Sequence, residues 1–296
     1  MSSRHLPPQA PAQPPTVVTP AAAPVDPAHA VDEAGGTAAA HAELRGVDTS
    51  MFDAQRERAA AIVARYPEPR SALLPLLHLA QYVEGHVSRS GIAFCADTLG
   101  LTTAEVSAVA TFYTMYKREP VGEHLVSVCT NTLCAALGGD AIYRAVGEAL
   151  GEPGAPLGHE QTSGAPGERG SLTLEHAECL AACDLAPVLT VDYEFYDRQT
   201  VESATDLIAA LQRGEKPDPT RGAPLTDFRG VELLLAGFFD DPEAGGPAAV
   251  SGPSADAATL RGARLAEERG WAAPPMPDAS PLSAAPETHT LPGGAS

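Results

Sequence analysis

Basic residues are scarce in this sequence: 19 lysines and arginines stand against 38 aspartates and glutamates, which gives a net charge of −19. Because nucleic acids are bound by clustered lysine and arginine, this imbalance argues against nucleic acid as a partner. A run of 18 apolar residues is also missing, so we expect no direct membrane insertion. The N-terminal residues lack the apolar core of a secretory signal, which favours a cytoplasmic protein.

The common catalytic motifs are missing as well. We find no glycine-rich dinucleotide loop, no phosphate-binding lysine motif and no nucleophile–base pair. We therefore expect that the chain alone neither binds NADH nor carries out hydride chemistry. The C-x-x-C motif is also absent, which argues against a dithiol oxidoreductase.

Four of the five cysteines form two close pairs, Cys129 with Cys134 and Cys179 with Cys183. Four thiolates that converge from two loops are a complete ligand set for one metal centre. The spacing favours an iron–sulfur cluster, because four intervening residues occur among two-iron proteins. Structural zinc remains an alternative, although its cysteines are most often two residues apart. Disulfides are less favoured, because the cysteine total is odd and a reducing compartment is expected.

Both cysteine pairs follow predicted strands. Alternating apolar residues predict a strand over 123–129, and further strands are predicted over 171–176 and 187–192. The chain changes direction where such strands end, so the cysteine side chains can converge there. Small residues beside the cysteines would let the backbone approach a bulky inorganic cluster; they are Ala135, Ala136, Ala181 and Ala182.

The remaining pattern predicts an α/β protein with a small helical bundle at its N-terminal side. Helices are expected over 53–66, over 71–84 with Ser71 as cap, and from a Thr102–Glu105 capping box onward. Two more helices are expected, over 140–150 and from Thr200 to Arg213. Residues 154–170, rich in glycine and proline, are expected to form a loop. The alternation of strands and helices predicts a small α/β sandwich.

The composition divides the chain into five parts. We expect disordered tails over 1–48 and 242–296, where proline, alanine and glycine dominate. The helical bundle is expected over 49–117 and the α/β domain over 118–217. Residues 218–241 are expected to be a linker that holds one short helix within 225–239. That helix either packs on its own chain or docks on a partner subunit.

Five stretches of the sequence resemble the small iron–sulfur subunit of respiratory complex I, the NADH:quinone oxidoreductase. The resemblance extends from Met51 to Pro217, and the cysteine spacing is its most specific part. The stretches are, in chain order, Ser71–Gln81, Ala110–Tyr116, Cys129–Cys134, Glu178–Pro187 and Tyr193–Asp197.

This resemblance implies a thioredoxin-like domain that carries one [2Fe-2S] cluster. By position, the cluster ligands would be Cys129, Cys134, Cys179 and Cys183. The expected partners are a flavoprotein subunit that binds NADH and FMN, together with other subunits of the hydrophilic arm of complex I. The expected activity is that of an electron carrier within the oxidoreductase. The expected location is the cytoplasmic face of the cell membrane, reached only through partner subunits.

Two other functions stay open at this point. A similar subunit serves NAD-linked hydrogenases and formate dehydrogenases, where it stands beside a similar flavoprotein. A zinc-stabilised interaction module without redox activity is the other alternative. We expect Cys95 to be a buried thiol without a ligand role. His176 is not expected to bind the metal, because the four cysteines already complete the site.

Overall fold

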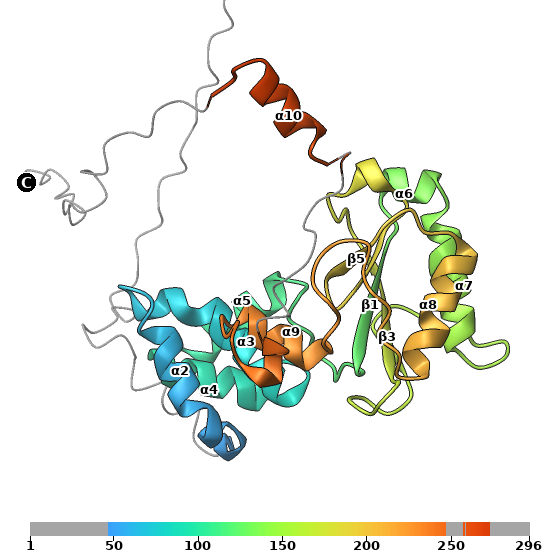
Figure 1. Cartoon of the computed structure of the whole chain (residues 1–296). Helices are drawn as coiled ribbons and strands as arrows, with labels where there is room; N and C mark the ends of the chain where they lie inside the picture. Colours follow the sequence, from blue (N-terminus) through green and yellow to red (C-terminus); the bar gives the residue numbers. More distant parts are fainter. Residues whose placement is uncertain (1–46, 247–256, 258, 273–296) are drawn as a thin grey trace, which may run out of the picture.

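The structure, a computed structural model, describes residues 47–246, 257 and 259–272. It consists of a helical bundle and a lobe built on a five-stranded sheet (Figure 1). The α/β fold predicted from the sequence is therefore confirmed. Most of the two predicted disordered tails, 1–46 together with 247–256, 258 and 273–296, lies outside the described residues.

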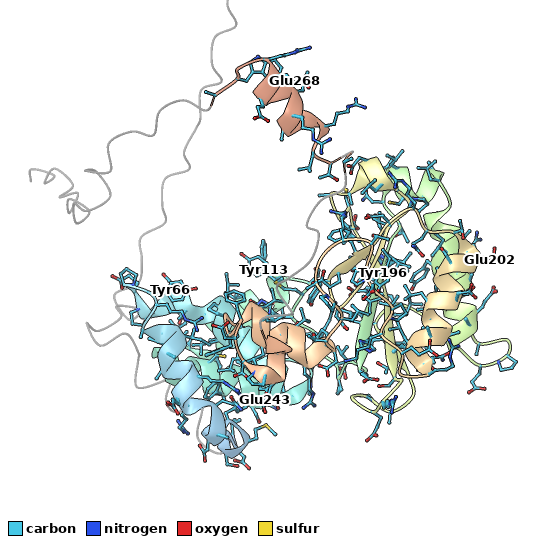
Figure 2. All side chains as sticks on the ribbon, viewed as in Figure 1. Tyr66, Tyr113, Tyr196, Glu202, Glu243 and Glu268 are labelled. Carbon is cyan, nitrogen blue, oxygen red and sulfur yellow. The ribbon has the colours of Figure 1, made fainter. Side chains whose placement is uncertain are left out.

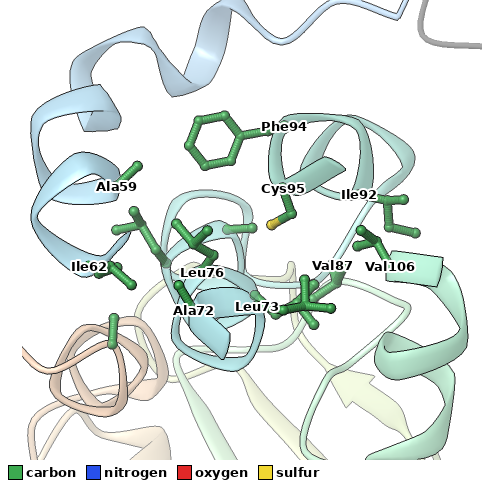
Figure 3. Packing of buried hydrophobic residues seen from close by; sticks show 14 of the residues in the cluster. Ala59, Ile62, Ala72, Leu73, Leu76, Val87, Ile92, Phe94, Cys95 and Val106 are labelled. Atoms are coloured by element: carbon green, nitrogen blue, oxygen red, sulfur yellow. The ribbon is translucent and has the colours of Figure 1, made fainter. Parts of the chain in front are cut away.

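The helical bundle is formed by short helices that close around an apolar core. Its elements are η2 (Ser50–Gln55), α2 (Arg56–Val63), η3 (Pro69–Ala72), α3 (Leu73–Glu84), α4 (Arg89–Leu99) and α5 (Thr103–Phe112). Side chains from α2, α3 and α4 point toward one another between the helices (Figure 3). Phe52 and Phe94 stack here with ring centroids 4.6 Å apart. Cys95 lies fully buried in this core, as expected for an unreactive thiol.

The capping box predicted at α5 is confirmed, because the Glu105 N–H donates to the Thr102 hydroxyl at 3.1 Å and the Thr102 N–H donates to the Glu105 carboxylate at 2.9 Å. The predicted cap of α3 is wrong: Ser71 lies within η3, and Ala72 precedes the helix. The sequence pattern does not predict α4, because Gly91 suggests a break. A Cβ on Gly91 would lie 3.2 Å from the Cβ of Ala80, so this glycine lets α4 pack closely on α3.

The sheet has the strand order β2-β3-β1-β4-β5. Its strands are β1 (His124–Cys129), β2 (Gln161–Ser163), β3 (Leu172–Ala177), β4 (Leu189–Val191) and β5 (Glu194–Tyr196). β1 and β3 are parallel, whereas the other three pairings are antiparallel. The sequence pattern does not predict β2 and β5, which have only three residues each. β2 lies inside the segment 154–170 that was expected to be a loop, and it pairs with β3.

Within the described residues, α-helices pack directly on one face of the sheet. α7 (Gly139–Leu150) and α8 (Val201–Gln212) pack against Val126, Val128 and their apolar neighbours (Figure 1). On the opposite face, the polar side chains of Glu175, Ser127 and Thr190 lie side by side on adjacent strands, and the ring of Phe195 follows on β5. The bundle and the segment that follows it approach this second face, and Lys117 forms an ion pair with Glu175 there.

The predicted helix near the C-terminal side is α9 (Phe228–Leu235), with Asp227 as its N-cap. It packs on α3, where Leu233 joins the bundle core. The buried carboxylate of Glu232 lies 2.6 Å from Nδ1 of His78. Of the two interpretations of this helix, the structure thus shows packing on its own chain.

Packed structure also continues beyond residue 241, where the sequence placed the start of a disordered tail. η5 (Pro242–Ala244) lies on the bundle, and Ala244 is buried in its core. Glu243 stands beside the bundle (Figure 2), with its carboxylate 2.7 Å from the guanidinium of Arg58. A further helix, α10 (Arg261–Glu268), has no buried residue. Among the described helices, none is long and apolar enough to cross a membrane.

Two leucines of α9 provide a matched test of its packing. We expect Leu233→Ala to lower the free energy of unfolding by about 2–5 kcal/mol, because it opens a cavity in the bundle core. Leu235→Ala should change it by less than about 0.5 kcal/mol, because this side chain is 41% exposed. Urea unfolding of the full chain measures both values. Equal losses in the two variants would show that α9 does not pack as described.

Candidate metal centre

The four paired cysteines meet at one edge of the sheet. Cys129 is the last residue of β1, and Cys134 lies in α6 (Thr132–Ala136) just after it. Cys179 follows β3, and Cys183 opens η4 (Cys183–Leu185). β1 and β3 run parallel with Cys129 opposite Ala177, so both strands end at the same edge. The structure therefore brings together all four cysteines that the sequence singled out.

The cysteines form two pairs that differ in burial. The sulfur atoms of Cys179 and Cys183 are 3.6 Å apart, and both residues are exposed. Cys129 and Cys134 interact electrostatically and are each 2% exposed. Cys183 also interacts electrostatically with Cys129 and Cys134, so the two pairs form one group. The inner pair lies in apolar surroundings with Ala182, Leu185 and Val188.

Hydrogen bonds join the loops that carry the cysteines. The backbone N–H of Cys129 donates to the Val188 carbonyl, and that of Thr130 donates to the Ala177 carbonyl, both at 3.2 Å. The side-chain amide of Asn131 donates to the carboxylate of Glu178 at 2.7 Å, which links the first cysteine loop directly to the second. The peptide bond between Ala186 and Pro187, which follows the last cysteine, is cis.

Glycine and alanine make room around the sulfur atoms. A Cβ on Gly139 would lie 2.5 Å from the carbonyl oxygen of Cys129 and 2.9 Å from that of Cys134. Only glycine lets α7 start so close to both residues. Ala181 has a φ of 57°, a left-handed conformation that turns the chain between Cys179 and Cys183. The close approach of α7 to Cys129 and Cys134 could have been predicted from one feature of the sequence, the glycine pair Gly138 and Gly139.

Burial controls the protonation of the Cys134 thiol. Burial raises the pKa of Cys134 to about 11, and the neighbouring Cys129 and Cys183 add to the effect. The hydrogen bond with Cys179 raises the pKa of Cys183. These thiols are therefore protonated at neutral pH, whereas iron binds the thiolate. Iron binding must release these protons.

The arrangement fits a [2Fe-2S] cluster. In such a cluster each iron takes two protein ligands, and the chain offers two cysteine pairs that adjoin each other. In the described part of the chain, no three His, Cys, Asp or Glu side chains are close enough to hold a single metal ion. His176 is exposed and lies against the ring of His159, with ring centroids 4.2 Å apart.

A cavity of about 650 Å³ opens between the bundle and the uncovered face of the sheet, next to Cys179. Ser127, Glu175 and Thr190 line it from the sheet, and Tyr113 lines it from the end of α5. Tyr113 projects on the side of the bundle that is nearer to the sheet lobe (Figure 2). The cavity therefore leads from solvent to the exposed cysteine pair.

Comparison with known proteins shows the family of this chain. Residues 59–212 match the model of the thioredoxin-like [2Fe-2S] ferredoxins. The chain belongs to this family. Membership confirms the resemblance inferred from the sequence and the predicted cofactor, one [2Fe-2S] cluster. The assignment of the four individual cysteines as its ligands stays a prediction.

Curated relatives of this ferredoxin have similar sequences over most of its length. It is 51% identical to the NADH-quinone oxidoreductase E subunit of Mycobacterium bovis over 221 residues, or 74% of this chain and 81% of the relative. It is 31% identical to the NADH-quinone oxidoreductase E 2 subunit of Rhizobium meliloti over 57% of this chain and 97% of that protein.

A solved structure of an NAD⁺-reducing [NiFe]-hydrogenase in the H₂-reduced state gives a TM-score of 0.40 at 16% identity. The match covers 47% of this ferredoxin and 22% of the hydrogenase chain. This likeness is too distant to favour the hydrogenase alternative.

The close approach at Gly139 generates a prediction about the metal centre. We expect Gly139→Ala to push apart the backbones of Cys129 and Cys134, which should lower the iron content and cost about 1–3 kcal/mol of stability. Iron analysis and urea unfolding of the purified chain measure the two effects. Gly262→Ala is the control, because a Cβ there meets no atom within 4 Å. Normal iron content in Gly139→Ala would contradict the prediction.

The raised pKa of Cys134 predicts a pH-dependent assembly of the cluster. Below a pKa of about 11, the thiolate fraction increases about tenfold for each pH unit. Anaerobic reconstitution of the apoprotein with ferrous iron and sulfide should therefore be faster at pH 9 than at pH 7. The growth of visible absorbance measures the rate. A rate that is the same at both pH values would show that deprotonation of these thiols does not limit assembly.

Proposed function

We propose that this chain is the electron-transfer subunit of an NADH:quinone oxidoreductase. It holds one [2Fe-2S] cluster on Cys129, Cys134, Cys179 and Cys183, and it accepts single electrons from the FMN of a partner subunit that binds NADH. The observation that carries the proposal is the convergence of the two cysteine pairs at the ends of the parallel strands β1 and β3. The relatives, both named as E-type subunits of NADH-quinone oxidoreductase, favour this assembly over a hydrogenase.

The bound cluster supplies one-electron chemistry, which the chain's own side chains lack. The thiolates of Cys129, Cys134, Cys179 and Cys183 would hold the two irons. Leu185 and Val188 surround the inner pair and keep water away from it. The outer pair is exposed, and Ala181 and Ala182 add little bulk between its two cysteines, so a partner can approach that side closely.

The partners in this proposal are the flavoprotein subunit and other subunits of the hydrophilic arm. The outer cysteines are open to solvent, and the exposed aromatic ring of Phe112, at 76%, stands near the entrance of the adjacent cavity. Exposed aromatic residues are frequent at the centre of protein interfaces. The complex would hold the chain at the cytoplasmic face of the cell membrane without a membrane segment of its own.

Replacement of single cysteines tests the proposed ligands. We expect Cys→Ser at any of the four positions to lose the cluster or change its spectrum strongly, because a hydroxyl is a poor ligand for iron. Iron content, visible absorption and the EPR signal of the dithionite-reduced chain measure the effect. Cys95→Ala is the control. This thiol lies in the bundle core, away from the four ligands, so its replacement should leave the spectrum unchanged.

A Cys179→Ser variant with unchanged iron content and EPR spectrum would contradict the assignment of that ligand. A colourless wild-type chain that contains stoichiometric zinc would overturn electron transfer as the function. A single S = 1/2 signal per chain after reduction is the result that the proposal requires.

A further inference from the structure

Residues 217–223, of which 218–223 were expected to belong to a linker, are fixed to the free edge of β5. The Thr220 N–H donates to the Phe195 carbonyl at 2.9 Å, and the Asp197 N–H donates to the Thr220 hydroxyl at 2.9 Å. The hydroxyl of Tyr196 donates to the Pro217 carbonyl at 2.6 Å. Arg221 and Phe195 form an antiparallel bridge. The segment thus pairs with the outer side of β5 through one isolated bridge.

Arg221 lies flat against the ring of Phe195. Its guanidinium carbon is 3.9 Å from the ring centroid, within the range of a cation–π contact. The same guanidinium donates to both carboxylate oxygens of Asp197, at 3.0 and 3.3 Å. Both partners of this ion pair are largely buried. A planar group held on two sides in this way has little freedom, so it fixes the position of the ring.

The ring of Phe195 belongs to the side of the sheet that carries the metal centre. Phe195 pairs with Thr190, which pairs with Ser127, so these three side chains share one face. Cys129 is two residues after Ser127 on β1 and therefore points to the same face. Phe195 packs against the apolar group that contains Cys129 and Cys134.

The ion pair adds no net charge beside the metal centre. Asp197 neutralises Arg221 at hydrogen-bond distance, so the field of the guanidinium is largely cancelled. The effect of this region on the metal centre therefore comes from the apolar ring of Phe195 and from the segment that holds it. Together they cover the inner cysteines on the side of β5, where no helix of the described chain covers the sheet.

We propose that Phe195, which Arg221 holds in place, shields the inner half of the [2Fe-2S] site, at Cys129 and Cys134, from water and thereby keeps the reduction potential of the cluster low. This inference rests on the proposed function, because it assumes the cluster on the four cysteines. Reduction adds a negative charge to the site, and water stabilises the more charged form. Solvent exposure is one of the factors that set the potential of such clusters.

The test is a redox titration of the full chain, loaded with its cluster and followed by EPR. At the midpoint potential of the wild type, we expect Phe195→Ala to raise the ratio of reduced to oxidised cluster about tenfold, or about 59 mV for one electron. Phe195→Leu should restore most of the wild-type ratio, because leucine keeps an apolar cover. Phe239→Ala, which removes a ring that is 54% exposed and lies outside the apolar group of Cys129 and Cys134, is the control and should change nothing.

Arg221→Lys keeps the charge opposite Asp197 but loses the planar stack, so it should shift the ratio in the same direction as Phe195→Ala. If Phe195→Ala cannot be loaded with iron, the Arg221→Lys variant alone tests the shielding role of Phe195. An unchanged potential in the loaded Phe195→Ala or Arg221→Lys variant would overturn the proposal. If Arg221→Gln lowers the potential and Phe195→Ala leaves it unchanged, Arg221 acts through its charge. That result would also overturn the proposal.

These outcomes are distinct from a failure of the proposed function. If the wild-type chain shows no [2Fe-2S] signal, the electron-transfer function fails. If the signal is present and Phe195→Ala leaves its potential unchanged, only the shielding role of Phe195 fails.

Discussion

The parallel pairing of β1 with β3 is the contact on which the metal centre depends. The two cysteine pairs are far apart in the sequence, and each follows one of these strands. The register that sets Cys129 opposite Ala177 brings both strand ends to the same end of the sheet, where Cys183 interacts with Cys129 and Cys134. A shift of this register by one residue would turn every side chain of the strand to the other face of the sheet. The hydrogen bond from Asn131 to Glu178 joins the two loops that follow these paired strands.

The one-sided cover of the sheet determines where a partner can approach. α7 and α8 close one face with an apolar core, which leaves the other face to polar side chains. The bundle meets this second face through Lys117 and through Tyr193, whose hydroxyl donates to the buried Glu232 of α9 at 3.3 Å. The bundle is thus connected to the sheet lobe by buried polar contacts, and the cavity between them leads to Cys179.

The metal centre combines a buried half with an exposed half. The inner cysteines are packed among apolar side chains, and this burial raises the pKa of Cys134. The outer cysteines are exposed on the turn that contains Ala181 and Ala182. A site that exchanges electrons with a partner needs both properties, because the ligands must be held rigidly while one side stays within reach.

The candidate ligands, the family and the α/β fold could all be predicted before the structure was known, because they depend on residue identities and short spacings. Cys129 and Cys134 follow a strand with clear alternation, and Thr102 with Glu105 forms a local capping box. β5 has three residues and no apolar run around it, so it carries too little pattern to be recognised, whereas β4, of equal length, lies within the largely apolar run 187–192. Gly91 suggests a break until the packing of α4 on α3 shows why glycine is needed there. The packing of α9 on its own bundle and the stacking of Arg221 on Phe195 could be learned only from the folded chain. Those contacts join residues that are distant in the sequence. They form because the folded chain buries the residues together, and local spacing does not encode that burial.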